Sequence, residues 1–347
     1  MKYFRDNIAA MSGYVPGEQP QGGKFVKLNT NENPYPPSPR VLQAIRDAAD
    51  RGLMRYPDPR ATSFRIRAAE VLGVEPDWIL CGNGSDDILT ILTRAFVGEG
   101  ELLRLPYPSY VLYKTLAEIQ GALAEEISFA PDWSLTESFF EQRDKLRLVF
   151  LPNPNSPSGT VVSKDSILKL AEQLDCPLLV DEAYADFADD NCIDLVGQNE
   201  KIMVSRTLSK SYGLAGLRFG YLVAQPQMIE QLAKVKDSYN CDSLAIAAAT
   251  AAMDDQAWLK QNRAMVVGTR QNLLDGLTQL GFNAIPSQAN FVWASHTTPV
   301  RPLYEQLKAN GVLVRYMNYP KWGDGLRVSV GTDEQVGACL ALLKTMV

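Results

Sequence analysis

The residues with the most evident chemical potential lie in the segment 202–220, IMVSRTLSKSYGLAGLRFG. It is predicted as a short buried strand, 202–205, a polar loop that places Lys210 between two serines, and a glycine-rich stretch that contains Arg218. Removing water from a lysine lowers its pKa and frees its nitrogen lone pair, which makes Lys210 a candidate amine nucleophile. Taken alone, the segment is more typical of an ordinary loop lysine.

Two other loops at predicted strand ends have the composition of binding loops. In GNGSD (82–86), the glycines and the N-terminus of the following helix could hold a phosphate, or Ser85 or Asp86 could simply cap that helix. The loop NPNSPSG (153–159) has two X-Pro steps that fix an extended path. It could contact a ligand or be only a rigid turn.

Five further side chains could act together with these loops. Asp181 directly follows four apolar residues, so it is either a strand-end cap or a charge held in a dry site, with Tyr184 three residues further on. Tyr110 could be a platform for a flat ligand or a core tyrosine. Arg315 and Arg327 each lie in an apolar strand, where they could bind a carboxylate or phosphate or form a structural salt bridge.

Together these groups meet the requirements of pyridoxal phosphate chemistry. Such chemistry uses a lysine that forms a Schiff base and a carboxylate that keeps the pyridine nitrogen protonated. It also uses a phosphate cradle, an aromatic platform and an arginine for the anionic group of the substrate. Each loop taken alone is explained by a turn, a cap or core packing, but the joint pattern favours a binding site.

Composition and charge exclude several other classes of protein. The chain has 347 residues, of which 46% are apolar and 21% charged, as in ordinary globular proteins. Its net charge of −6 predicts no basic surface for nucleic acid or an anionic membrane. The single histidine, His296, excludes a His-based triad, and no metal site is expected because the five cysteines form no CxxC pair. Without a signal sequence or a long apolar run, we expect a cytoplasmic protein.

The order of predicted elements indicates an α/β fold. Strands and helices alternate from residue 78 onward, and the predicted strands are 79–81, 102–105, 123–127, 148–151, 178–180 and 202–205. This order predicts a mostly parallel sheet covered by helices on both faces, with ligands at the carboxyl ends of its strands. After residue 240, long helices precede three short strands. We predict an arm (1–37), a large α/β domain (38–240) and a small α+β domain (241–347).

Ordered motifs along nearly the whole chain resemble those of the fold-type I pyridoxal-phosphate aminotransferases of classes I and II. They are KLNTNENP, RYPDP, GNGSDD, NPNSPSG, VDEAY, TLSKSYGLAGLRFG, SQANFVW and LRVSVGT. The resemblance implies a mostly parallel seven-stranded-type sheet between helices, and pyridoxal 5'-phosphate as the cofactor. One motif departs from the family's usual NPNNPTG, because this chain has NPNSPSG. Either Asn155 or Ser156 could therefore make the cofactor contact.

The resemblance also implies a role for each residue that matches a family motif. Lys210 would form the Schiff base and move the proton, Asp181 would pair with the pyridinium nitrogen, Tyr184 would bond to the phenolic oxygen, and Tyr110 would stack on the ring. Tyr56 would reach the cofactor phosphate from the neighbouring subunit, which implies a homodimer with shared active sites. The other residues implied at the phosphate are Ser85, Asp86, Thr207, Ser209 and Arg218.

Within the family the likeness is strongest to the members that act on histidinol phosphate, through NTNENPYPPSP, the ANF segment and two arginines. It implies amino transfer between L-histidinol phosphate and 2-oxoglutarate in histidine biosynthesis. Arg315 and Arg327 would clamp the anionic group, and Tyr14 and Asn29 would close over the substrate. The alternatives are an aromatic amino acid aminotransferase or a phospho-amino-acid decarboxylase of the same fold, and a non-catalytic binding protein that keeps the fold.

Overall fold

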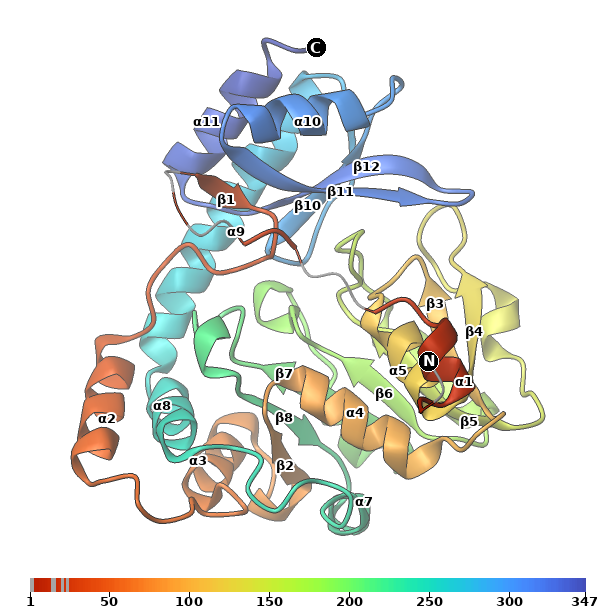
Figure 1. The fold of residues 1–347 in the computed structure, drawn as a ribbon, viewed down its shortest axis with the longest axis vertical. Coiled ribbons are helices and arrows are strands. Elements are labelled where there is room, and N and C mark those ends of the chain that lie inside the picture. Colours follow the sequence, from red (N-terminus) through yellow and green to blue (C-terminus); the bar gives the residue numbers. More distant parts are fainter. Residues whose placement is uncertain (1–2, 14–16, 20–21, 23–24) are drawn as a thin grey trace.

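The computed structural model describes residues 3–13, 17–19, 22 and 25–347, and it contains two sheets. The larger sheet has seven strands in the order β2-β8-β7-β6-β5-β3-β4, and the smaller has five in the order β1-β11-β12-β10-β9. Figure 1 shows the smaller sheet with its helices at one end of the molecule and the larger sheet at the other, with the helix α9 rising from one toward the other.

The larger sheet is formed by a continuous part of the chain. Its strands are β2 (Ile79–Gly82), β3 (Leu102–Tyr107), β4 (Leu123–Ser128), β5 (Leu146–Pro152), β6 (Leu178–Asp181), β7 (Ile202–Thr207) and β8 (Gly220–Val223). Strand β8 pairs antiparallel with both β2 and β7, and every other pairing in this sheet is parallel. The prediction of a mostly parallel sheet is therefore confirmed. The sequence interpretation missed β8, which directly follows the glycine-rich loop and has only four residues.

Alternate residues of the central strands face opposite cores, as the two-residue period of a strand requires. In β6, Leu178 and Val180 pack into a core with α2 (Pro39–Asp50), α3 (Thr62–Leu72), α6 (Lys164–Gln173) and α8 (Ser243–Asp254). Leu179 packs on the other side with α4 (Ser85–Phe96), α5 (Leu112–Gln120) and α7 (Pro226–Leu232). Helices thus cover both faces, which explains why these strands are apolar on both sides.

Capping residues explain where several helices begin. The Ser38 hydroxyl accepts a hydrogen bond from the backbone N–H of Arg40, and Pro39 supplies the first helical position of α2. Ser163 caps α6 in the same way. Thr332 and Gln335 form a reciprocal capping box at α11 (Asp333–Leu343).

The smaller sheet combines distant parts of the chain. Strands β9 (Asn283–Ala284), β10 (Phe291–Ser295), β11 (Val312–Tyr319) and β12 (Gly323–Ser329) are antiparallel to their neighbours, while β1 (Val26–Leu28) pairs in parallel with β11. Helices α9 (Gln256–Gln279), α10 (Arg301–Ala309) and α11 pack with them around a third core. The predicted arm was expected to be irregular throughout, but it contains β1 and the short helix α1 (Asp6–Ala10).

The carboxyl ends of the larger sheet face the second sheet. Strands β2, β5, β6 and β7 end at Gly82, Pro152, Asp181 and Thr207, so the loops predicted to carry chemistry all begin on this side. None of the helices in the described part of the chain combines the length and apolarity that crossing a bilayer requires.

Candidate active site

A cavity of about 180 Å³ lies where these strand ends meet the smaller sheet and the N-terminal segment. It brings together residues from six predicted motifs that are up to about three hundred positions apart in the chain. Its lining includes these predicted residues: Asn29, Ser85, Asp86, Tyr110, Ser156, Asp181, Tyr184, Thr207, Ser209, Lys210, Arg218, Arg315 and Arg327.

Asp181 is a buried carboxylate at the end of β6. Its Oδ1 accepts hydrogen bonds from the Ser205 hydroxyl at 3.0 Å and the Ala183 backbone N–H at 3.2 Å. Its Oδ2 accepts one from the Tyr113 hydroxyl at 2.6 Å. Burial raises the pKa of Asp181, and the hydrogen bonds from Tyr113 and Ser205 act against that shift. The charged form therefore depends on these donors.

Lys210 and Tyr184 lie close together in the lining of the same cavity. The Lys210 ammonium donates to the backbone carbonyl of Thr30 at 3.2 Å and lies 5.7 Å from the centre of the Tyr184 ring. The Tyr184 hydroxyl accepts a hydrogen bond from the Asn31 side-chain amide at 3.0 Å, which fixes its oxygen. The N-terminal segment therefore orients both functional groups.

The residues predicted at the phosphate, apart from Tyr56, form a polar cradle at the N-terminus of α4. The guanidinium of Arg218 lies 3.0 Å from an Asp86 carboxylate oxygen and donates to the Ser209 hydroxyl at 3.4 Å. Gly84 has φ +82°, and a Cβ there would lie 2.6 Å from the Arg218 guanidinium. Only glycine lacks the Cβ that would clash here, so it lets the backbone approach Arg218 this closely. The backbone N–H groups of the first turn of α4 follow Gly84 directly.

The cradle is braced by the chain itself. The Ser209 backbone N–H donates to the Thr207 hydroxyl at 3.2 Å, and both side chains are buried. Arg218 adopts a left-handed backbone conformation with φ +53°, which turns the chain between the loop and β8. These residues could hold an anion of phosphate size through N–H groups, hydroxyls and one guanidinium.

The two arginines of the smaller sheet lie directly opposite each other in the β11–β12 pair. Arg327 donates to the Ser156 hydroxyl at 2.9 Å and to the Asn29 carbonyl at 3.2 Å, and it lies over the Phe291 ring. Asn29 in turn donates to the Glu18 carbonyl. This end of the cavity therefore carries two positive charges that an anionic substrate could reach.

Three predicted residues stand apart from the rest. Asn155 does not line the cavity: its amide donates to the Pro108 carbonyl and the Ser158 hydroxyl, while the neighbouring Ser156 faces the cavity. The cofactor contact of Asn155 therefore stays a prediction, because in this structure its amide bonds to Ser158 of its own loop and to Pro108 of another. Tyr56 is 80% exposed and stacks on Tyr239 outside the cavity. Tyr14 lies outside the described residues.

The sequence interpretation missed three residues that contact the predicted ones. Tyr113, Ser205 and Asn31 bond to Asp181 or Tyr184. A signal existed for Tyr113, because it lies three positions after Tyr110 at a helix start, where side chains share a face. The alternation of β7 places Ser205 two residues before Thr207 on the same face. Nothing in the local pattern pointed to Asn31.

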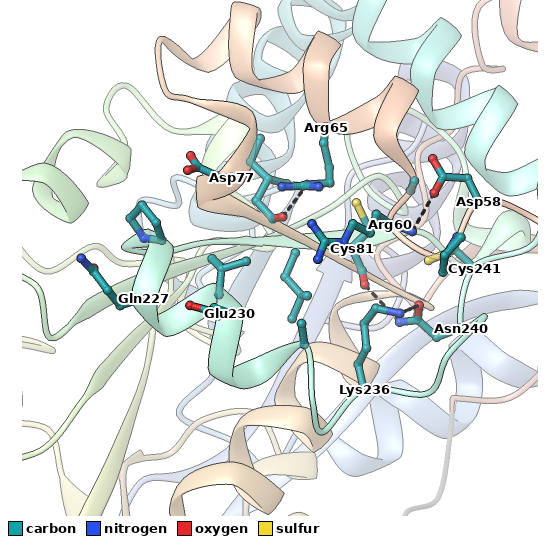
Figure 2. Close-up of a pocket in the computed structure, with 17 residues that line it drawn as sticks. Asp58, Arg60, Arg65, Asp77, Cys81, Gln227, Glu230, Lys236, Asn240 and Cys241 are labelled. Carbon is teal, nitrogen blue, oxygen red and sulfur yellow. Dashed lines mark hydrogen bonds between the residues drawn. The ribbon is translucent and has the colours of Figure 1, made fainter.

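A second cavity, of about 370 Å³, lies beside strand β2 at the edge of the larger sheet (Figure 2). Its charged groups serve the local structure. Arg65 donates to the Ile79 carbonyl at 2.9 Å, Asp58 accepts from the Thr62 N–H at 2.7 Å, and the Asn240 amide donates to the Cys81 carbonyl. Size alone does not select a functional cavity, and the convergence of a lysine, a buried carboxylate and two arginines makes the first cavity the candidate site.

Comparison with known proteins shows the family of this chain. The family model of the class I and II aminotransferases matches residues 23–342. The chain belongs to that family. Histidinol-phosphate aminotransferase of Rhodopirellula baltica is 59% identical over 98% of this chain and 95% of the relative, and that of Geotalea daltonii is 44% identical over 98% of each.

Solved structures of aminotransferases share the fold. The histidinol-phosphate aminotransferase of Sinorhizobium meliloti, solved in complex with pyridoxal-5'-phosphate, superposes with a TM-score of 0.91 at 25% identity over 100% of this chain and 99% of that one. An aspartate aminotransferase variant of Thermus thermophilus gives 0.85 at 22% identity, with both chains fully covered, and this shows the shared fold alone. The predicted aminotransferase family and fold type are thus confirmed.

Proposed function

We propose that this aminotransferase uses pyridoxal 5'-phosphate to move the amino group of L-histidinol phosphate to 2-oxoglutarate, in histidine biosynthesis. The observation that carries the proposal is the convergence of Lys210, buried Asp181 and the pair Arg315 and Arg327 on one cavity. The names of the relatives at 59% and 44% identity support the choice of amino donor.

The lining residues fit this cofactor. Asp181 Oδ2 accepts a single hydrogen bond among the described residues, so a second acceptor position is available for the ring nitrogen. The N-terminus of α4, Ser209 and Arg218 offer N–H, hydroxyl and guanidinium groups to the phosphate. Tyr110 would stack on the ring. When bound, the cofactor supplies a ring that withdraws electrons from the reacting carbon of the substrate.

The catalytic side chains would have distinct roles. Lys210 would hold the cofactor covalently and move the proton at the substrate carbon that carries the amino group. Asp181, whose charged form is favoured by its hydrogen bonds, would hold the proton on the ring nitrogen. The Tyr184 hydroxyl, oriented by Asn31, would donate to the oxygen on the ring. These tasks need no histidine, in keeping with the single His296 of the sequence.

The arginine pair would bind the anionic group of each substrate in turn. A ping-pong reaction admits the amino donor and 2-oxoglutarate to the same cavity at different times. Arg315 and Arg327 lie in register on adjacent strands, so one pair can meet the phosphate of the donor or a carboxylate of the acceptor. Asn29 of the N-terminal segment would close this end.

We further propose a homodimer in which the partner subunit's Tyr56 completes the phosphate cradle. Support comes from the exposure of this segment: Leu53, Met54 and Tyr56 are 59%, 87% and 80% exposed in the single chain, an unusual cluster of apolar side chains. We also propose that the two sheets belong to the separate domains 38–240 and 241–347, and that the enzyme works in the cytoplasm.

A single-turnover experiment tests the proposed reaction. The purified enzyme, loaded with cofactor, is mixed with histidinol phosphate in the absence of 2-oxoglutarate, and the visible absorbance of the lysine-bound cofactor is followed. We expect the absorbance to fall as the amino group is transferred, and to return when 2-oxoglutarate is added. Faster bleaching with phenylalanine would instead favour an aromatic aminotransferase, release of carbon dioxide would favour a decarboxylase, and absence of cofactor absorbance would favour a non-catalytic protein.

A further inference from the structure

We propose that Tyr113 is a positioning residue that fixes both the carboxylate and the aromatic platform of the cofactor site. The inference rests on the proposed use of pyridoxal phosphate. Tyr113 is the second residue of α5, it is completely buried, and it lines the inner wall of the active-site cavity. Its hydroxyl and its ring contact two different functional residues, so the two contributions can be separated by mutation.

The hydroxyl of Tyr113 sets the orientation of Asp181. It donates to Oδ2 at 2.6 Å, a distance typical of a hydrogen bond to a charged oxygen. The other oxygen, Oδ1, takes the Ser205 hydroxyl and the Ala183 N–H. With both oxygens engaged, rotation of the carboxylate is blocked. One acceptor position of Oδ2 stays available to the ring nitrogen of the cofactor.

The same hydrogen bond favours the charged form of Asp181. Burial raises the pKa of this carboxyl and so favours its neutral form, whereas the hydrogen bonds from Tyr113 and Ser205 favour the anion. Burial also raises the pKa of Tyr113 well above its usual value, so the phenol keeps its proton and remains a donor. A neutral Asp181 would no longer hold a proton on the ring nitrogen by charge attraction.

The ring of Tyr113 supports Tyr110. The two rings meet edge to face, with centroids 5.5 Å apart and planes at 85°. Tyr113 packs on its other side against Phe150 of β5, with centroids 5.1 Å apart. Tyr110 is only partly buried, so this contact restricts the orientation in which it can stack on the cofactor.

The test compares Tyr113→Phe, which removes only the hydroxyl, with Tyr221→Phe, a buried tyrosine of β8 that packs against Phe64 away from the cavity. Loss of a hydrogen bond to a charged group predicts a fall in kcat of about ten- to a hundredfold in Tyr113→Phe, with the KM for histidinol phosphate changed less than about threefold. Tyr221→Phe should have the same kcat and the same KM as the wild type.

A spectroscopic readout separates positioning from general destabilisation. With cofactor labelled at the ring nitrogen, the ¹⁵N resonance of the wild-type holoenzyme should report a protonated ring at neutral pH, and that of Tyr113→Phe should lose its proton at a lower pH. Ser205→Ala should shift this transition less, because Oδ1 keeps the Ala183 N–H. Melting curves establish that each variant is folded.

The ring contribution is tested with Tyr113→Leu. This variant removes the edge contact to Tyr110 as well as the hydroxyl, so it should bind pyridoxal phosphate about two- to tenfold more weakly than Tyr113→Phe. Equal affinities would refute the platform role, and an unchanged ¹⁵N transition in a folded Tyr113→Phe would refute the carboxylate role. A wild-type protein that binds no cofactor would instead refute the proposed function itself.

Discussion

The two ends of the active-site cavity are built on different principles. At the cofactor end, Asp181 and Thr207 are the last residues of adjacent parallel strands, and Lys210 follows three residues later. At the other end, Arg315 and Arg327 form the last pair of the antiparallel β11–β12 ladder in the smaller sheet. The first end is fixed by the register of the buried central strands of the larger sheet, while the second depends on how one sheet lies over the other.

The contacts that fix the substrate end lie partly outside the cavity. The aromatic bridge, which we define as Tyr107 and Trp133 together with Tyr319 and Trp322, joins the β11–β12 pair to the larger sheet. Trp133 and Trp322 have ring centroids 4.3 Å apart, and Tyr107 and Tyr319 meet edge to face at 5.9 Å. Because alternate residues of β11 share a face, Tyr319 points to the same side as Arg315.

The largest expected effect is at the cofactor end. Lys210→Ala should abolish covalent cofactor binding and lower kcat by about a thousandfold or more, because it removes both the amine and the proton carrier. Loss of the visible absorbance band of the bound cofactor and a steady-state assay measure this. Lys201→Ala, whose ammonium only bonds to the Leu174 carbonyl, is the matched control and should stay active. An unchanged absorbance band in Lys210→Ala would show that another residue holds the cofactor.

The second-largest effect is expected for Tyr56, and it tests whether two subunits share the cofactor end of each cavity. Tyr56→Ala should lower activity about tenfold to a hundredfold through loss of a hydrogen bond to the charged phosphate. A mixture of Tyr56→Ala and Lys210→Ala proteins, after subunit exchange, should recover activity, since each hybrid contains one site with both residues intact. Mixtures that stay as inactive as their components, or a fully active Tyr56→Ala, would contradict a shared site.

At the substrate end the effect should appear in binding. Arg327→Gln should raise the KM for both histidinol phosphate and 2-oxoglutarate by about ten- to a hundredfold, because one charged hydrogen-bonding group serves both anions. Steady-state kinetics with each substrate varied in turn measure this. Arg147→Gln, which alters a surface pair with Glu101, is the control. A change confined to one substrate would mean that the two anions use different residues.

The smallest effect should come from the aromatic bridge. Trp322→Ala removes one aromatic pair, so the KM values should rise about two- to tenfold with little change in kcat. Trp322→Phe should restore most of the loss, because it keeps a ring against Trp133. Steady-state kinetics of both variants measure these effects. If Trp322→Ala lowered kcat by as large a factor as it raised KM, the two ends of the cavity would not be positioned independently.

Much of the cofactor end could be predicted from the sequence. A short buried strand that ends in a polar loop is a local pattern, so Asp181 and Lys210 could be placed at strand ends. In a mostly parallel sheet the carboxyl ends of the strands lie at the same edge, so these loops could be predicted to meet there. The spacing of Tyr113 from Tyr110 indicated a shared face, but it gave no sign of the hydrogen-bond partner sixty-eight positions away.

The sequence by itself determined the alternation of strands and helices, the polar strand-end loops and the types of chemical groups available, because these follow from local periodicity and side-chain chemistry. Only the tertiary structure decided that Ser156 rather than Asn155 faces the cavity, that β1 of the N-terminal segment joins the second sheet, and that Arg315 and Arg327 lie opposite each other. Each of these depends on a loop conformation or a pairing between distant strands, which no local pattern specifies.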